Sequence, residues 1–205
     1  MKKLSFMLTM AMMVIATTAS AQFANSSKKS NRTTANTENY NRITAAYNSV
    51  SVEDLDLMGF SVGWTKGINI ANDLPLYLET GIGVMYAFGE LEEGVDESYM
   101  GVNVPVLFTY KFFPIETMAI APYAGLNLRG NILGKEKWEG DDNYDWFDSY
   151  EEGGYDAKRF GVGASLGVNF DFEKLSIGVG YTFDFTEIME ETKVSYFTVS
   201  FGMNF

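Results

Sequence analysis

The most acidic stretch of the chain, 133–158, contains side chains whose spacing matches a known metal-ligand pattern. Carboxylate and amide oxygens at positions 1, 3, 5 and 12 are ligands of a calcium-binding loop. The matching residues here are Asp141, Asn143, Asp145 and Glu152. Position six of such a loop is glycine, whereas this chain has Trp146. Because nine acidic residues in one stretch produce such spacings by chance, we expect a solvated loop and keep a weak calcium site as the alternative.

The chain contains neither histidine nor cysteine among its 205 residues. Histidine is the commonest general base and metal ligand, and cysteine supplies thiol nucleophiles and disulfides. Hydrolases with a serine or carboxylate at the reaction centre also use histidine by the usual route. We therefore predict no catalysis and no cofactor. The net charge of −12 argues against nucleic acid as a partner, because the nucleic-acid backbone is itself an anion.

Six further charged residues lie in segments that are otherwise apolar, small or glycine-rich. They are Arg42, Glu79, Lys111, Arg129, Arg159 and Asp184. An enclosed charge without a partner has a large free-energy cost, so the role of these residues depends on the elements that hold them.

The segment 192–205 shows the kind of element involved. One face carries Phe197, Val199, Phe201, Met203 and Phe205, and the intervening residues, apart from Tyr196, are small or polar. Strict alternation of this kind predicts a β-strand with two differently solvated faces. We expect this strand to pair with the first strand and so close a barrel, with its apolar face in lipid.

Seven earlier segments repeat the alternation, with one apolar face and one polar or glycine-rich face. They lie near 40–49, 57–67, 75–88, 99–112, 119–132, 159–170 and 175–185. Several have ten to fourteen residues, the length that a tilted strand needs to cross a bilayer. Pro105 cannot donate a ladder hydrogen bond, so we expect a bulge there. The pattern predicts an all-β fold, an eight-stranded antiparallel up-and-down transmembrane β-barrel; a soluble barrel or sandwich is the alternative.

The connections between these segments fall into two alternating sets. Short turns follow the second, fourth and sixth segments, whereas longer acidic stretches follow the others, at 50–56, 89–98, 133–158 and 186–191. Aromatic residues gather near both ends of the strands, as in the two interfacial girdles of membrane barrels. We expect the short turns to face the periplasm and the acidic loops to face outward.

The N-terminal residues predict export. Lys2 and Lys3 precede an apolar run, and Ala19-Ser20-Ala21 supplies a cleavage site, so 1–21 is interpreted as a secretory signal peptide. A flexible polar segment follows at 22–39, and the barrel domain occupies 40–205. The predicted location is the bacterial outer membrane.

Several motifs together resemble a known family. Glu79-Thr80-Gly81-Ile82-Gly83, Asn103-Val104-Pro105-Val106-Leu107, Pro122-Tyr123-Ala124-Gly125 and the terminal Phe205 are similar to the small outer-membrane β-barrels common in Bacteroidetes, which are PorT-like and lie within the OmpA/OmpX-like barrels. The likeness covers nearly the whole exported chain, and its motifs identify an architecture rather than an activity. It implies an eight-stranded barrel whose terminal strand is read by the insertion machinery.

An eight-stranded barrel is only wide enough inside for side chains. We therefore predict that the six charged residues line the lumen in a paired network that serves packing. Glu79 is expected near the level of Lys111, and Arg159 close to Asp184, with Arg129 at the height of Arg159. A path for small ions is the alternative.

The functional prediction is a structural or surface-binding protein, monomeric, in contact with outer-membrane lipid and lipopolysaccharide. Its acidic loops would contact ligands or a protein partner, with calcium bridging loop carboxylates to lipopolysaccharide phosphates as one form of binding. The alternatives are a narrow porin-like channel for small solutes or ions, or an accessory outer-membrane component of a secretion system.

Overall fold

The computed structural model describes residues 38–52, 55–71, 73–92, 95–138, 143–148, 157–189 and 192–205. The predicted signal peptide, and the polar segment up to residue 37, lie outside these ranges. The described part of the chain contains the strands β1 (Tyr40–Val52), β2 (Leu55–Asn69), β3 (Leu76–Glu92), β4 (Val95–Tyr110), β5 (Phe112–Ile115), β6 (Met118–Trp138), β7 (Asn143–Asp145), β8 (Phe160–Phe172), β9 (Leu175–Asp184) and β10 (Val194–Asn204).

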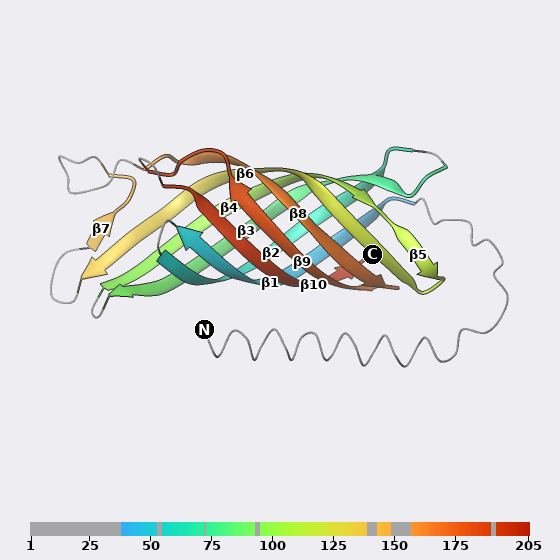
Figure 1. Ribbon diagram of the computed structural model, residues 1–205, viewed down its shortest axis with the longest axis horizontal. Coiled ribbons are helices and arrows are strands. Elements are labelled where there is room, and N and C mark those ends of the chain that lie inside the picture. Colours follow the sequence, from blue (N-terminus) through green and yellow to red (C-terminus); the bar gives the residue numbers. More distant parts are fainter. Residues whose placement is uncertain are drawn as a thin grey trace. The chain divides into compact units, whose positions relative to one another are not determined.

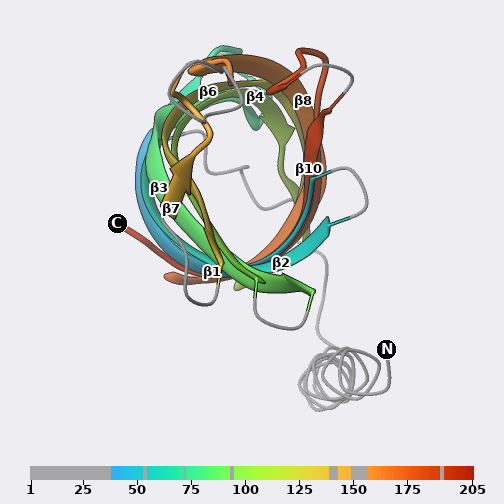
Figure 2. The ribbon, with the colours of Figure 1, turned by 90° about the vertical axis from the view of Figure 1, so that its left-hand side faces the viewer.

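Eight of these strands form one closed ring. The pairing runs β4-β3-β2-β1-β10-β9-β8-β6, every pair is antiparallel, and β6 pairs with β4 to complete the circle. The last strand closes onto the first, from Arg42↔Asn204 to Val52↔Val194. Figure 1 shows the strands tilted about the barrel, and Figure 2 looks along it from the end where β7 lies. The predicted eight-stranded antiparallel up-and-down barrel is confirmed, and a two-sheet sandwich is wrong.

Two short strands lie beside the ring. β5 pairs with the first residues of β6, and β7 pairs with the last ones. They mark the two ends of the barrel, which we name the β5 end and the β7 end (Figure 1). β1 begins and β10 ends at the β5 end. Within the described ranges there is no helix of the length and apolar character that crossing a membrane requires.

Alternation decides which side chains face outward. Outward positions around the ring carry large exposed apolar groups, such as Val62 at 63%, Phe108 at 56% and Phe201 at 58% exposure. Inward positions carry glycine, polar groups or buried apolar groups. Gly81 and Gly125 show why glycine is needed inside, since a Cβ on either would lie 2.0 or 2.2 Å from a backbone oxygen of the neighbouring strand.

Several strands are longer than the sequence indicated. β3 extends to Glu92, β4 begins at Val95, and β6 continues to Trp138. Much of the expected loops 50–56 and 89–98, and the start of 133–158, is therefore strand. The physical reason is that the inward positions remain buried there, as Val50 and Val95 show, while the acidic residues Asp56, Glu90 and Asp96 occupy outward positions.

The bulge lies elsewhere than predicted. Pairing of β3 with β4 keeps one register from Thr80↔Val106 to Gly83↔Asn103, so Pro105 interrupts no register. The β3–β4 pairing shifts only near its end, between Glu90↔Asp96 and Glu92↔Val95. A second shift lies between β4 and β6, where Met100↔Leu133 is followed by Gly101↔Asn131 and Ile132 is the additional residue. A bulge needs an extra residue on one strand, which a proline does not itself provide.

Candidate functional site

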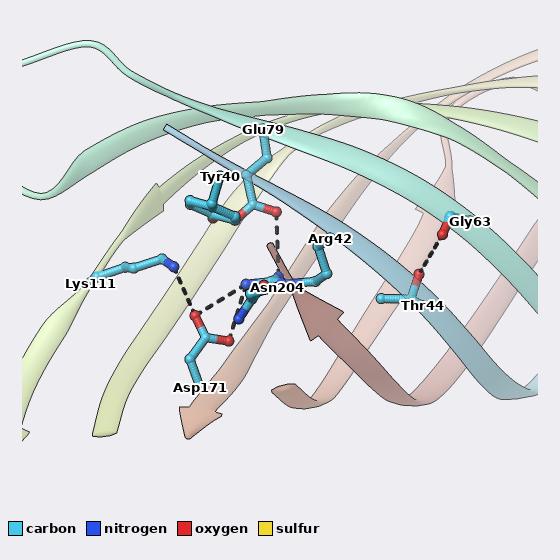
Figure 3. A network of polar contacts seen from close by, with 8 residues as sticks. All are labelled: Tyr40, Arg42, Thr44, Gly63, Glu79, Lys111, Asp171 and Asn204. Atoms are coloured by element: carbon cyan, nitrogen blue, oxygen red, sulfur yellow. Dashed lines mark hydrogen bonds and ion pairs between the residues drawn. The ribbon is translucent and has the colours of Figure 1, made fainter. Parts of the chain in front are cut away.

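The interior of the barrel has four levels, namely an ion cluster, a polar chamber, a second ion pair and an apolar layer, and the first of these lies at the β5 end. We name it the basal ion cluster, and its members are Tyr40, Arg42, Glu79, Lys111, Asp171 and Asn204 (Figure 3). They come from the starts of β1 and β3, the residue after β4, and the ends of β8 and β10. Barrel closure brings these strand ends together at one level.

Arg42 is the centre of the basal ion cluster. Its Nη1 lies 3.6 Å from Glu79 Oε2, its Nη2 lies 3.1 Å from Asp171 Oδ1, and its Nε donates to Asn204 Oδ1 at 2.8 Å. The Nζ of Lys111 lies 2.9 Å from the other oxygen of Asp171. Two cations therefore face two carboxylates, which removes the cost that an unbalanced charge would have in this interior.

Tyr40 covers this cluster. Its hydroxyl donates to Glu79, and its ring centroid lies 3.6 Å from Lys111 Nζ and 5.2 Å from the ring centroid of Tyr77. A desolvated ammonium over an aromatic face is stabilised by the ring quadrupole. The Lys111 ammonium is thus held by an anion on one side and by an aromatic ring on the other.

The basal ion cluster separates two cavities. A cavity of about 320 Å³ at the β5 end is lined by Tyr40, Lys111 and Asp171. A second cavity of about 180 Å³, which we name the central chamber, is lined by Arg42 and Glu79 and by many hydroxyl and amide groups. The latter include Thr44, Asn48, Asn127, Ser165, Thr182 and Thr198.

The groups around the central chamber bond largely to one another. Asn48 donates to Ser61 at 2.9 Å and accepts from Thr198 at 2.9 Å, and Ser165 and Thr182 lie 2.7 Å apart. A polar cavity of this size can hold several hydrogen-bonded waters. The middle of the barrel is therefore polar but organised by its own side chains.

A second buried ion pair lies beyond the central chamber, toward the β7 end. Arg129 of β6 pairs with Asp184 of β9, and its Nε donates to Asn131 Oδ1 at 2.9 Å. The same amide oxygen accepts from the Tyr99 hydroxyl at 2.6 Å. Gly163 makes room for the pair, since a Cβ there would lie 2.6 Å from Asp184 Oδ1.

The fourth level is apolar and fills the β7 end. We name it the apical plug, and its buried members are Val50, Val52, Leu57, Met85, Ala87, Tyr99, Trp146, Ile188, Val194 and Tyr196. Trp146 stacks on Tyr99 with ring centroids 6.1 Å apart. The stack lies over Gly134, where a Cβ would be 2.3 Å from Trp146, and the Trp146 amide donates to the Gly134 carbonyl at 2.9 Å.

Five of the six predicted lumen charges are buried, in two groups. Arg42, Glu79 and Lys111 belong to the basal ion cluster, whereas Arg129 and Asp184 form the second pair. The expected pairing partners differ. Lys111 pairs with Asp171, which directly follows the strand expected at 159–170 and so fell in the short turn expected after it. Asp171 is in fact the penultimate residue of β8, and it faces inward as Gly167 and Asn169 do. Continuing this alternation by two residues would have placed Asp171 in the lumen.

The prediction that Arg159 lines the lumen beside Asp184 is wrong. Arg159 precedes β8, is exposed, and places its guanidinium carbon 4.6 Å from the Phe147 ring centroid. Asp184 lies opposite Gly163, four residues farther along β8. From the sequence both residues were expected near the same end of the barrel. The register between β8 and β9, which separates them, could not be deduced from the sequence alone.

The calcium-loop candidate falls largely outside the described residues, since Asp141 and Glu152 lie there. Asn143 belongs to β7. Asp145 Oδ1 accepts a hydrogen bond from the Phe147 amide at 2.9 Å, so this carboxylate stabilises the local turn. Within the ranges that the structure describes, no group of three or more acidic side chains is placed to hold a metal ion.

Comparison with known proteins gives a likeness in structure. No protein-family model matches the chain, and no curated protein matches its sequence. Among solved structures, Neisserial surface protein A (NspA) is 18% identical, with 81% of this chain and 95% of that chain covered and a TM-score of 0.50.

Two further solved structures have lower TM-scores. The outer membrane enzyme PagL is 11% identical over 78% of this chain and 97% of that chain, with a TM-score of 0.48. Ail of Yersinia pestis, in complex with the heparin analogue sucrose octasulfate, is 13% identical over 82% of this chain and 97% of that chain, with a TM-score of 0.44. At 18% identity, the likeness to NspA concerns the fold alone, so this chain shares its fold, that of a small antiparallel β-barrel, with NspA.

Proposed function

We propose that this chain is an outer-membrane β-barrel, exported by residues 1–21 and monomeric in the bilayer. The observation that carries the proposal is the band of exposed apolar side chains around the ring, which includes Val62, Phe108, Leu126, Leu166 and Phe201. Contiguous apolar patches larger than a few hundred Å² are rare on soluble monomers, whereas a lipid-facing barrel requires such a band.

Aromatic side chains at both ends support this placement. Trp64 and Phe112 are exposed toward the β5 end, and Tyr86, Phe88 and Phe185 toward the β7 end. Amphipathic and aromatic rings at two levels match the two interfaces of a bilayer. The β5 end, with its short turns, faces the periplasm in this proposal, and the β7 end with its acidic connections faces outward.

The proposed role is structural or surface-binding rather than conducting or catalytic. The apical plug and the basal ion cluster lie on either side of the central chamber, and the buried carboxylates of Glu79, Asp171 and Asp184 are each paired with arginine or lysine. The groups available for contact are those at the β7 end, toward outer-membrane lipid, lipopolysaccharide or a protein partner. Absence of histidine supports a role without catalysis.

Two measurements test this proposal. Protein extracted from the membrane fraction should keep its fold in SDS without heating and change gel mobility on boiling, whereas recovery in the soluble fraction without detergent would contradict the placement. In planar bilayers the refolded protein should show no stable channel. Channels of large unitary conductance would favour the narrow porin-like alternative.

Cross-linking in intact cells separates the remaining roles. Adducts with lipopolysaccharide or with a surface protein would support a binding role for the β7 end. Recovery instead of a defined set of secretion components would replace that role with the accessory one.

A further inference from the structure

Two buried carboxylates face each other above the apical plug. Glu97 of β4 lies directly opposite Glu136 of β6, which in turn lies opposite Tyr144 of β7. Glu97 is 7% exposed and Glu136 is 5% exposed. Directly opposed residues on one face have Cβ atoms about 5 Å apart, a separation that two carboxylates can bridge through one ion.

The bulge in β6 creates this pair. Before Ile132 the exposed residues of β6 are even-numbered, such as Leu126 and Leu128, whereas after it Lys135 and Lys137 are exposed. Glu136 therefore points inward, and the two lysines beside it point away from Glu97. Without the additional residue, the lysines would share the inner face with Glu97 and could neutralise it.

Glu97 has an unsatisfied oxygen. Its Oε2 is buried without a hydrogen-bond partner, and among the described residues no lysine or arginine forms an ion pair with it. A buried, unpaired carboxylate is costly, so the structure calls for a cation or a proton at this oxygen.

The surroundings of Glu97 leave the charge uncompensated. Glu136 faces it from β6, Tyr99 is the next inward residue of its own strand, and β3 contributes Gly89 opposite it. Glu97 lies farther toward the β7 end than the exposed aromatic residues of that end, because Phe88 pairs with Ser98 and Glu97 is the next residue outward along β4. Burial, and then the Glu136 carboxylate, raise the pKa of Glu97 to about 7.

We infer that Glu97 and Glu136 form a binding site for a divalent cation at the β7 end of the barrel. Carboxylate oxygens supplemented by water are the ligands of calcium and magnesium, so one such ion would neutralise the Glu97 carboxylate while Glu136 supplies a second ligand oxygen. The site lies two residue pairs along β4 and β6 from Tyr99 and Gly134, which makes it the next inward level beyond the stack of Trp146 on Tyr99. A bound ion would therefore tie β4 to β6 directly above the apical plug.

Terbium luminescence tests the site on the full exported chain, refolded in detergent and freed of metal with a chelator. Excitation of tryptophan should sensitise bound terbium, because Trp146 lies in the adjacent layer, and calcium should compete. Glu97→Gln and Glu136→Gln should each weaken terbium and calcium binding about tenfold or more, since affinity follows the number of charged ligands. The matched control is Asp96→Asn, an exposed acid on the neighbouring, outward position of β4.

The outcomes are distinguishable from binding elsewhere in the acidic stretch. Loss of binding in Asp141→Asn or Glu152→Gln, with Glu97→Gln unaffected, would overturn the inference in favour of the calcium-loop spacing. Equal affinity in all variants, or no saturable binding below millimolar calcium at pH 8, would overturn it as well. Heating in the presence of calcium is the second measurement: calcium should raise the unfolding temperature of the parent and Asp96→Asn proteins, and this gain should be absent from both glutamine variants.

Discussion

Asp171→Asn is the sharpest perturbation of the barrel interior, because Asp171 bridges both cations of the basal ion cluster. Its two oxygens contact Arg42 at 3.1 Å and Lys111 at 2.9 Å, and its side chain is 6% exposed. The amide leaves two buried cations facing the single carboxylate of Glu79. Breaking a buried ion pair by removing one partner costs about 3–5 kcal/mol, so the unfolding equilibrium constant should rise by about 10²- to 10⁴-fold.

The double variant Lys111→Met, Asp171→Asn tests whether charge balance is the cause. It leaves Arg42 with Glu79, and the methionine keeps the contact of the lysine stem with the Tyr40 ring. Replacing a buried ion pair by groups of similar volume is often neutral, so most of the lost stability should return. Asp56→Asn, an exposed acid on β2, is the control and should change stability by less than about 0.5 kcal/mol.

Urea titration in lipid vesicles, followed by gel mobility without heating, measures these changes. A cost below about 1 kcal/mol for Asp171→Asn would show that water or a neighbouring group compensates the cluster. A double variant no more stable than the single one would show that geometry, rather than charge balance, governs this layer.

Three further predictions use the other layers. Arg129→Met and Asp184→Asn should each destabilise the barrel by about 3–5 kcal/mol in the same titration, because each leaves a buried charge unpaired, whereas Arg159→Ala should change stability by less than about 0.5 kcal/mol because Arg159 is exposed. Gly134→Ala places a Cβ 2.3 Å from Trp146 and should displace the apical plug, so liposome-swelling assays should show solute entry absent from the parent protein; unchanged permeability would contradict a sealing role. In chelator, stability should fall as pH rises from about 4.5 through 7, because folded Glu97 binds its proton more tightly than the unfolded chain does, and Glu97→Gln should abolish this slope.

Strand content was predictable from the sequence because alternation is a local property. Phe197 to Phe205 and the seven earlier segments each specify a strand and its outward face without reference to any other part of the chain. Closure of the last strand onto the first followed from the same pattern. Acidic composition misled at the strand ends, because Glu90 and Asp96 occupy outward positions of strands that continue past the apolar band.

The interior contacts were less predictable because they depend on register. A displacement of four residues between β8 and β9 decides that Asp184 meets Arg129 rather than Arg159. Similarly, one additional residue at Ile132 decides that Glu136, and not Lys135, faces inward. Trp146 packs in the apical plug because the chain turns back over Gly134. No periodic pattern in the sequence predicts this turn.

Arg42 also has a consequence for the order of events in folding. Its bond to Asn204 joins residues 162 positions apart, across the seam between β1 and β10, where Asn41 and Phe205 also exchange backbone hydrogen bonds at 2.8 and 2.9 Å. The hairpins of the barrel can form from neighbouring segments, whereas this seam closes the longest loop, so we expect its contacts to form last, after the rate-limiting step. Contacts made after the rate-limiting step govern how fast a native protein opens. We therefore expect the basal ion cluster, which joins the two strands of the seam, to lower the unfolding rate more than it raises the folding rate.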